Sequence, residues 1–438
     1  MKKDGMSIRS KEHKTMSESP CALLWDESFL WGLMAWRTLR EAGLPFALIR
    51  SDDIKAGALS HYAMLFVPGG WASAKLSSLG EKGHAEICSF VENGGSYLGI
   101  CGGAGLATGS GIGLLPIQRK APQERVPSFS GPIHLFTTNH IVWKNIKTPV
   151  FSAWWPFQFH IVDESKFNIL ARFGEAQPDA MSADINVGDG RKTGWSDLEA
   201  RYGILLDPKR LKGEPAVVEG SFGQGKVILS LVHFDTPGDI NSAIVLRNLW
   251  RYLIPGGDSR TDAVNIYCEN RIKANEYRGC DEILQDIQSA VNGLIVLGEQ
   301  RFLWRPRNSL FFDWRRGVKG MEYSTLAAMI GEIARDVSVF LSRGSVKEIC
   351  SSTSDDPLQL KKDLMMIREL ILPFVEDAKK LLTLESVFLT KAFLSPVDCP
   401  DEGINRLRRE LFGSSRSYGG KYKHLIDAAD QLLYKLIQ

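Results

Sequence analysis

The chain has 438 residues, of which 44% are hydrophobic and 24% are charged. This length exceeds the usual size of one domain, so we expect two domains, each with its own core. The net charge is only +2, which gives no overall reason to expect a nucleic-acid-binding or membrane-surface protein. The apolar stretches are also too short to cross a bilayer.

The cysteines and the N-terminus indicate a reducing compartment. The seven cysteines are scattered, without the spacing of a disulfide framework or a zinc site. Residues 1–20 are rich in Lys, Ser and Glu and lack the apolar segment of a signal peptide, so we expect a flexible tail there. The sequence therefore predicts a cytoplasmic protein that holds neither a metal nor another cofactor.

Residues 21–100 alternate short apolar runs with helical stretches. Strands are expected over 21–25, 46–49, 64–67 and 96–100, and helices over 30–39 and 85–91. This alternation implies strands paired in parallel through right-handed crossovers. Ligands of such sheets bind beyond the C-terminal ends of the strands.

The next part of the chain is less regular. Short β-like runs at 141–143 and 157–161 suggest antiparallel additions to the sheet. Residues 215–232 predict a hairpin with a glycine turn, which places His233 at the end of its second strand. A helix is expected over 240–253.

Beyond residue 257 the apolar periodicity becomes helical throughout. Helices are expected over 283–297, 326–341, 358–382 and 425–437, the third of them kinked or split at Pro373. We interpret residues 258–438 as an all-helical second domain, most simply a bundle. A protein partner could bind there.

The segment from Gly99 to Gly103 has the form G-x-C-x-G, with Cys101 at a strand-to-helix turn. A nucleophile on such a tight turn needs neighbours that are nearly free of side chains. The N-terminus of the following helix favours a thiolate, and its first amide could serve an oxyanion hole. A base and a carboxylate that orients it are available in His233 and Asp235, at the end of the hairpin.

Residues 67–70, 90–104 and 220–235 resemble the amidotransferase-like domain at the N-terminus of eukaryotic biotin-protein ligases, within the class I glutamine amidotransferase-like superfamily. The resemblance covers about residues 21–256. It implies a flavodoxin-like, parallel-core α/β sheet with helices on both faces, followed here by the helical domain. By the same resemblance Cys101 is the nucleophile, His233 the base and Asp235 the orienting carboxylate, where that superfamily usually has Glu. The oxyanion-binding turns would be formed by Gly69, Gly70, Gly102 and Gly103.

Two departures limit this resemblance. Class I glutaminases read G-x-C-x-G-x-Q, whereas this chain has Gly105 at the last position, which argues against glutamine hydrolysis. The biotin-adenylate motif of the G-R-G-R type is also absent, so we do not expect the protein to biotinylate a substrate.

Two further clusters each have a functional and a structural interpretation. The aromatic segment 154–160 could supply a pocket wall through Trp155, Gln158 and His160, but we favour a loop packed on the sheet. Residues 301–320 hold six basic side chains and one acid, Asp313. We favour a seam between the domains over a protein-binding or nucleic-acid-binding surface.

The leading hypothesis is a Cys-dependent hydrolase or acyl transferase that acts on a small amide or ester. The alternative is an inactive ligand-sensing or scaffolding module. Gly105, at the position where glutaminases have Gln, favours this alternative. A third possibility is the intracellular protease and deglycase superfamily. There the base usually follows the cysteine closely, whereas Gly102 to Leu106, the residues directly after Cys101, include no His.

Overall fold

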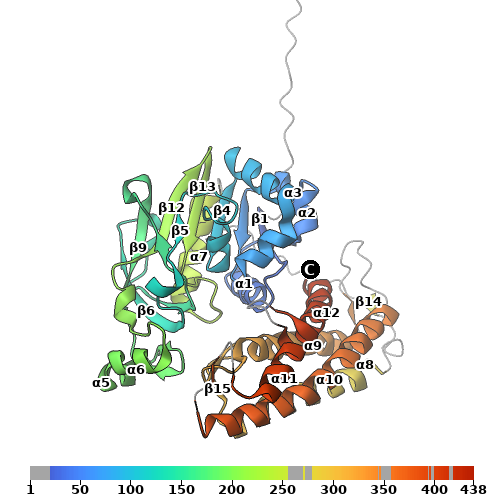
Figure 1. Ribbon diagram of the computed structural model, residues 1–438. Helices are drawn as coiled ribbons and strands as arrows, with labels where there is room; N and C mark the ends of the chain where they lie inside the picture. The colour runs from blue at the N-terminus through green and yellow to red at the C-terminus, as the bar shows by residue number, and fades with distance from the viewer. Residues whose placement is uncertain are drawn as a thin grey trace, which may run out of the picture.

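The computed structural model describes residues 20–254, 270–271, 279–343, 345–346, 357–392, 394–395, 399–413 and 418–438. An α/β region ends at residue 254, and a helical region begins at residue 279 and packs beside it (Figure 1). The expected boundary near residue 257, the tail 1–19, Cys268 and Cys350 lie outside the described residues. None of the described helices is long and apolar enough to span a membrane.

A mixed sheet of eleven strands organises the described α/β region. Its parallel core runs in the order β2 (Phe46–Ile49), β1 (Cys21–Leu24), β3 (Met64–Val67), β4 (Ser96–Ile100) and β13 (Gly225–Ser230). Antiparallel strands extend it through β12 (Pro215–Phe222), β9 (Asn168–Ala176), β6 (Phe129–Thr137), β10 (Met181–Ser182) and β11 (Ile185–Asn186), with β7 (Val150–Trp154) also paired to β6. The predicted α/β class is confirmed.

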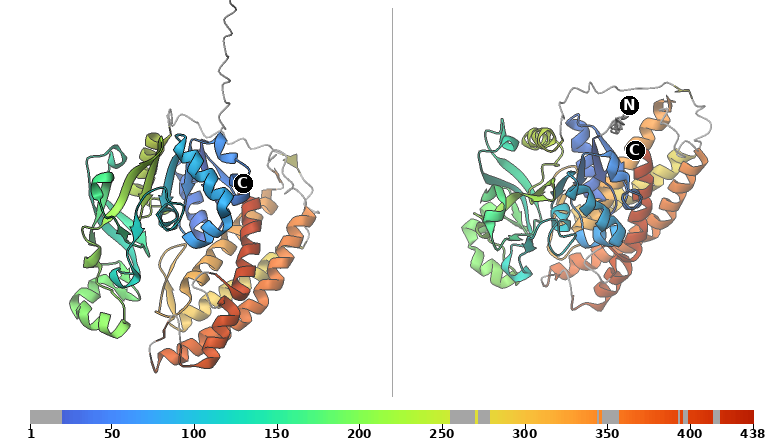
Figure 2. Two further views of the ribbon diagram at one scale, coloured as in Figure 1. Left: turned by 45° about the horizontal axis from the view of Figure 1, so that its top comes forward. Right: turned by 90° about the horizontal axis from the view of Figure 1, so that it is seen from above.

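Helices cover both faces of the parallel core. On one face α1 (Leu30–Glu41) packs against α7 (Ile240–Leu253), and on the other α3 (Ala72–Glu92) packs against α2 (Ser51–Lys55) and α4 (Gly102–Leu106) (Figure 2). Two further helices, α5 (Val187–Thr193) and α6 (Trp195–Tyr202), lie at the antiparallel end. β2 and β3 lie on opposite sides of β1, so the direction in which successive strands are added to the sheet reverses at β1. Such a switch point opens a crevice at the C-terminal ends of the parallel strands.

Several short elements differ from their predictions. The predicted helix 85–91 begins at Ala72, and its helical pattern is broken at Gly80, which has a φ of 59°. Residues 141–143 form a 3₁₀ turn instead of a strand, and the imidazole of His140 accepts a hydrogen bond from the amide of Val142 there. Within 157–161 only β8 (Phe159–His160) is a strand, paired with β5 (Gln118–Arg119). Other 3₁₀ turns occupy Ala58–His61, Pro122–Glu124, Glu164–Lys166 and Pro208–Leu211.

The helical region contains α8 (Cys280–Gln300), α9 (Gly320–Arg343), α10 (Pro357–Leu389), α11 (Glu402–Phe412) and α12 (Gly420–Ile437). Helix α10 contacts α8, α11 and α12 and continues through Pro373, so it is not split. The region is not all-helical, because β15 (Trp304–Pro306) pairs with β16 (Phe312–Trp314), and β14 (Asn270–Arg271) pairs with β17 (Ser345–Val346). Neither these strands nor α11 were predicted.

The two regions meet along a polar and aromatic seam. Arg315 lies 3.3 Å from the Asp184 carboxylate, Arg316 donates to the Tyr202 carbonyl oxygen at 2.9 Å, and Arg307 donates to the Ser130 hydroxyl at 2.9 Å. These three arginines belong to the basic cluster 301–320, and their partners lie in the α/β region. The contacts therefore favour the seam interpretation of that cluster.

Candidate functional site

The nucleophile candidate Cys101 follows β4 directly and caps α4. Its φ of 50° and ψ of −106° place a non-glycine residue in a sparsely populated conformation, which is typical of residues held under strain at functional sites. The amide of Cys101 donates to the Ser230 carbonyl at the end of β13, at 2.8 Å. The turn is thus fixed to the neighbouring strand, with the cysteine half-buried.

The glycines around Cys101 permit a close approach of two turns. A β-carbon on Gly102 would collide with the carbonyl of Gly70, and one on Gly103 would collide with the carbonyl of Val67. The amide nitrogen of Gly70 would be 2.9 Å from that β-carbon of Gly102, and Gly70 itself has a φ of 108°. The ring of Trp31 packs over Gly69. The structure therefore brings the four glycines predicted for the oxyanion site together.

The candidate base and its carboxylate follow β13. Because β13 pairs in parallel with β4, with Ser230 opposite Ile100, His233 emerges at the same edge of the sheet as Cys101. Both His233 and Asp235 are completely buried, and Nδ1 of His233 donates to Oδ1 of Asp235 at 2.8 Å. This bond orients the imidazole and leaves Nε2 as the atom that could exchange a proton.

Electrostatics favour the protonated form of His233. Burial alone lowers the pKa of His233, but the Asp235 carboxylate and, to a smaller extent, Cys101 outweigh it and raise the pKa to about 9. Nε2 nevertheless has no hydrogen-bond partner among the described residues. The thiol of Cys101 is instead 3.9 Å from the carbonyl oxygen of Trp154. Cys101 is therefore a neighbour of the imidazole, near enough to raise the pKa of His233.

Aromatic side chains from both regions surround this pair. Trp31 stacks on the His233 ring with 5.0 Å between centroids, and the centroid of Phe311 lies 5.5 Å from that of Trp31 and 4.7 Å from that of Trp154. Phe311 is completely buried and comes from the helical region. The site is therefore walled by both parts of the chain.

The three predicted wall residues have different surroundings. Trp155, with a φ of 49°, stacks on Trp314 at 5.0 Å and lines a cavity of about 320 Å³. Gln158 is buried, and its Oε1 accepts from the Val126 amide at 2.9 Å. His160 is exposed on β8. Of these three residues, Trp155 lines the cavity described here, and the packed-loop interpretation fits Gln158.

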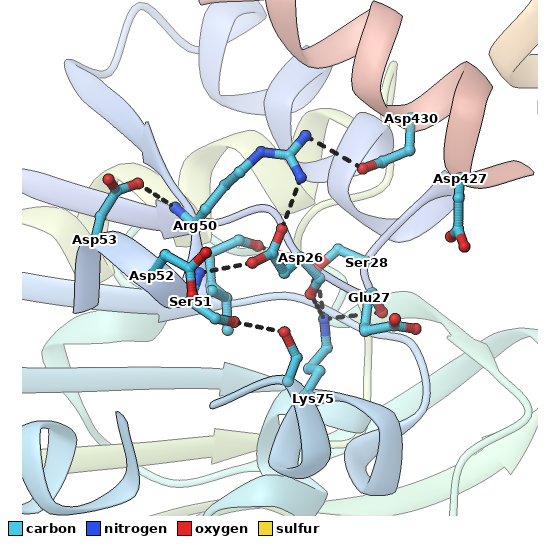
Figure 3. Close-up of polar contacts among 12 residues, drawn as sticks. Asp26, Glu27, Ser28, Arg50, Ser51, Asp52, Asp53, Lys75, Asp427 and Asp430 are labelled. Atoms are coloured by element: carbon cyan, nitrogen blue, oxygen red, sulfur yellow. Dashed lines mark hydrogen bonds and ion pairs between the residues drawn. The ribbon is translucent and has the colours of Figure 1, made fainter. Parts of the chain in front are cut away.

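A buried lysine, Lys75, contacts the turn that follows β1 (Figure 3). The Lys75 ammonium donates to the carbonyls of Asp26 at 3.3 Å and Glu27 at 3.2 Å and to the Ser28 hydroxyl. Burial lowers the pKa of Lys75 to about 7. The Glu27 carbonyl lies against Gly70, so Lys75 holds the turn after β1 against the glycine turn.

The same turn is tied to the helical region. Arg50, after β2, binds the Asp26 carboxylate at 3.0 Å and reaches Asp430 of α12 at 3.5 Å (Figure 3). Lys423 of α12 pairs with Glu27 at 3.0 Å. Helix α12 therefore closes the edge of the sheet beside β1 and β2.

Sequence reasoning missed Trp31, Lys75 and Phe311. One signal was present: Lys75 continues the buried stripe of α3 that contains Leu79, Gly83, Ile87 and Val91, where a lysine is unusual. Trp31 looked like an ordinary core residue, and nothing local marks Phe311, because its neighbours at the site are distant in sequence.

Comparisons with known proteins bear on the fold. Residues 55–110 match the family model described as biotin-protein ligase, N terminal. No curated protein matches the chain. Among solved structures, a protein described as a candidate GMP synthase component from Thermoplasma acidophilum is 12% identical with a TM-score of 0.33, covering 53% of this chain and 92% of its own. A ThuA-like protein from Bacteroides uniformis is 14% identical with a TM-score of 0.34, covering 56% and 96%.

A β-galactosidase from Rahnella sp. R3 is also similar, at 14% identity and a TM-score of 0.35, over 54% of this chain and 31% of that enzyme. These likenesses are too weak to carry an argument about function. The matched segment runs from α2 through β3 and α3 to the Cys101 turn and α4. The amidotransferase-like resemblance is thus confirmed where it is strongest: residues 55–110 match the biotin-protein ligase N-terminal family.

Proposed function

We propose that the protein is a Cys-dependent, amidotransferase-like hydrolase or acyl transferase that acts on a small amide or ester. One observation carries the proposal: the parallel pairing of β4 with β13 brings the strained Cys101 turn to the same sheet edge as the buried His233–Asp235 pair. A nucleophile, a base and an orienting carboxylate are the groups that acyl transfer through a thioester requires.

The proposed reaction begins when the Cys101 thiolate attacks the carbonyl carbon, forming a C–S bond while the carbonyl oxygen becomes an oxyanion. The amides of Gly70 and Gly102 would donate to that oxyanion. Collapse breaks the bond to the amine or alcohol, which takes a proton from the His233 imidazolium. Water, or another acceptor nucleophile, then attacks the thioester while His233 accepts its proton, and the C–S bond breaks to release Cys101.

Alkylation of Cys101 by iodoacetamide tests the Cys–His pair without a known substrate. We expect Cys101 to react well below the pH at which a free thiol does, and His233→Ala to slow that reaction at neutral pH at least tenfold. The rate at Cys101 is followed by site-resolved mass spectrometry. His140→Ala is the matched control, since His140 also lies beside a carboxylate, 4.0 Å from Glu219. Equal rates in wild type and His233→Ala would refute the proposal.

A second candidate is a ligand-sensing or scaffolding module that has lost turnover. Two observations favour it: Gly105 stands where glutaminases have Gln, and Nε2 of His233 has no hydrogen-bond partner among the described residues. In that case Cys101 would alkylate slowly and indifferently to His233. Binding of a protein partner to the helical region would then be the activity to seek.

A further inference from the structure

The position of the missing glutamine is occupied by an arginine from another segment. Arg119 lies on β5, and a β-carbon on Gly105 would collide with its Nη2 atom. The same guanidinium carbon lies 4.8 Å from the centre of the Phe157 ring. Although Arg119 as a residue is exposed, its guanidinium is therefore packed between Gly105 and Phe157.

This guanidinium is close to the nucleophile. The amide of Gly105 donates to the carbonyl of Cys101 at 2.9 Å, so the two residues are joined across the first turn of α4. Arg119 and Cys101 also interact electrostatically, the cysteine favouring the charged guanidinium.

The positive charge of Arg119 forms no ion pair with a carboxylate within the described part of the chain. Burial lowers the pKa of Arg119, and although Cys101 counteracts this, the positive charge of Arg125 nearby lowers it further. Positive charges that lie near one another are stabilised when an anion binds beside them.

We propose that Arg119, assisted by the charge of Arg125, forms an anion-binding subsite beside Cys101. The acyl compound attacked by Cys101 would carry a carboxylate or phosphate group that pairs with the planar fork of Arg119. Glutamine recognition is replaced by recognition of a negative charge, which explains why residue 105 has no side chain. The reaction part of this assignment rests on the proposed function, whereas the anion site itself does not.

The test compares two alkylating reagents of similar size and the same leaving group: anionic iodoacetate and neutral iodoacetamide. Their rates at Cys101 are measured on the full chain, and the iodoacetate-to-iodoacetamide ratio is the readout. We expect Arg119→Met to lower this ratio about three- to tenfold, because one positive charge near Cys101 is removed. Arg119→Lys should retain most of the ratio, because the charge remains.

A matched control is Arg40→Met. Arg40 also lies over an aromatic ring, 4.7 Å from the centre of Trp36, but nine residues beyond Trp31 in α1, about 14 Å along the helix axis. Its loss should leave the ratio unchanged. Gly105→Gln supplies a second variant: the new side chain displaces the guanidinium and should lower the ratio as Arg119→Met does.

Protection experiments distinguish the source of the anion. Malonate or inorganic phosphate, at matched ionic strength, should slow iodoacetamide in wild type but not in Arg119→Met, and the better protector identifies carboxylate or phosphate as the ligand group. An unchanged ratio in Arg119→Met, with no protection by either anion, would overturn the anion site. Indifference of the iodoacetamide rate to His233→Ala would overturn the proposed function instead, so the two failures are separable.

Discussion

Replacing Asp235 with Asn should reverse the protonation of His233 at neutral pH. In the wild type, burial opposes the imidazolium, but Asp235 at 2.8 Å and Cys101 together raise the pKa of His233 from 6.5 to about 9. Without the carboxylate, burial remains, so the pKa should fall below 6.5. The difference corresponds to more than about 3 kcal/mol of interaction. Cys101→Ala should lower the pKa less, since Asp235 is the stronger influence.

The pKa shift also predicts how folding stability depends on pH. The folded state holds the His233 proton more tightly than the unfolded chain, so the stabilisation is complete below about pH 6.5. It is then lost as the pH rises through about 9. Asp235→Asn should remove this dependence, so the gap in unfolding free energy between wild type and variant should narrow between these two pH values.

Carbon–proton NMR of ring-labelled histidine, recorded from pH 5 to 10, measures the titration directly. The chain has eight histidines, and His233→Gln assigns the relevant resonance. Glu219→Gln, which alters the neighbour of His140, should leave the His233 curve unchanged. A wild-type His233 that titrates at or below pH 6.5, or one whose titration Asp235→Asn does not move, would refute this electrostatic reasoning.

Three further predictions concern stability and the glycine turn, and chemical unfolding measures each. Arg408→Met should lower the free energy of unfolding by about 3–5 kcal/mol, because Arg408 bonds to Glu385 at 2.9 Å and its loss leaves that buried carboxylate without a cation. Arg409→Met removes an exposed pair with Glu402 and should lower it by under about 1 kcal/mol. An equal loss in both variants would contradict this. Burial raises the pKa of Asp430 to about 7, so the ionisation of this carboxyl opposes folding. Asp430→Asn should therefore be more stable than wild type above about pH 7, by up to about 4 kcal/mol. Below about pH 4 the two proteins should not differ in stability on this account. A gap that does not depend on pH would argue against it. Gly102→Ala should destabilise the protein by about 1–3 kcal/mol and suppress alkylation of Cys101, because the new β-carbon meets the Gly70 carbonyl. Gly331→Ala is the control: its β-carbon would lie in open space on α9, so it should be neutral or stabilising by up to about 1 kcal/mol.

The parallel core was predictable because its strands are short apolar runs that alternate with helical stretches. Residues 46–49, 64–67 and 96–100 match β2, β3 and β4 in full, and 240–253 matches α7. The sequence failed where local pattern and tertiary context disagree. Ile141 to Trp143 looks like a strand, yet these residues turn so that the Trp143 indole can donate to the Leu170 carbonyl at 3.0 Å. Helix α11 is strongly charged and gave too little apolar signal.

The candidate site could be predicted only in its local parts. The glycine spacing identifies the Cys101 turn, and the H-x-D pair follows a recognisable hairpin. Arg119 could not be predicted, because its relation to Gly105 depends on how β5 folds back over α4. The same holds for Phe311, which reaches Trp31 from 280 residues away in the chain.

Because Phe311 of the helical region is buried against the cysteine site, the position of the β15–β16 hairpin and the arrangement of that site depend on each other. Its ring touches Trp31, which stacks on His233, so movement of the β15–β16 hairpin would withdraw support from the imidazole. Whatever ligand prefers one placement of that hairpin must therefore change occupancy at the cysteine site, and the reverse must hold to the same extent. Binding of a ligand at the hairpin would be detectable as an altered affinity of the cysteine site for its own ligand, and the reverse. Phe311→Ala should weaken this coupling between the two sites.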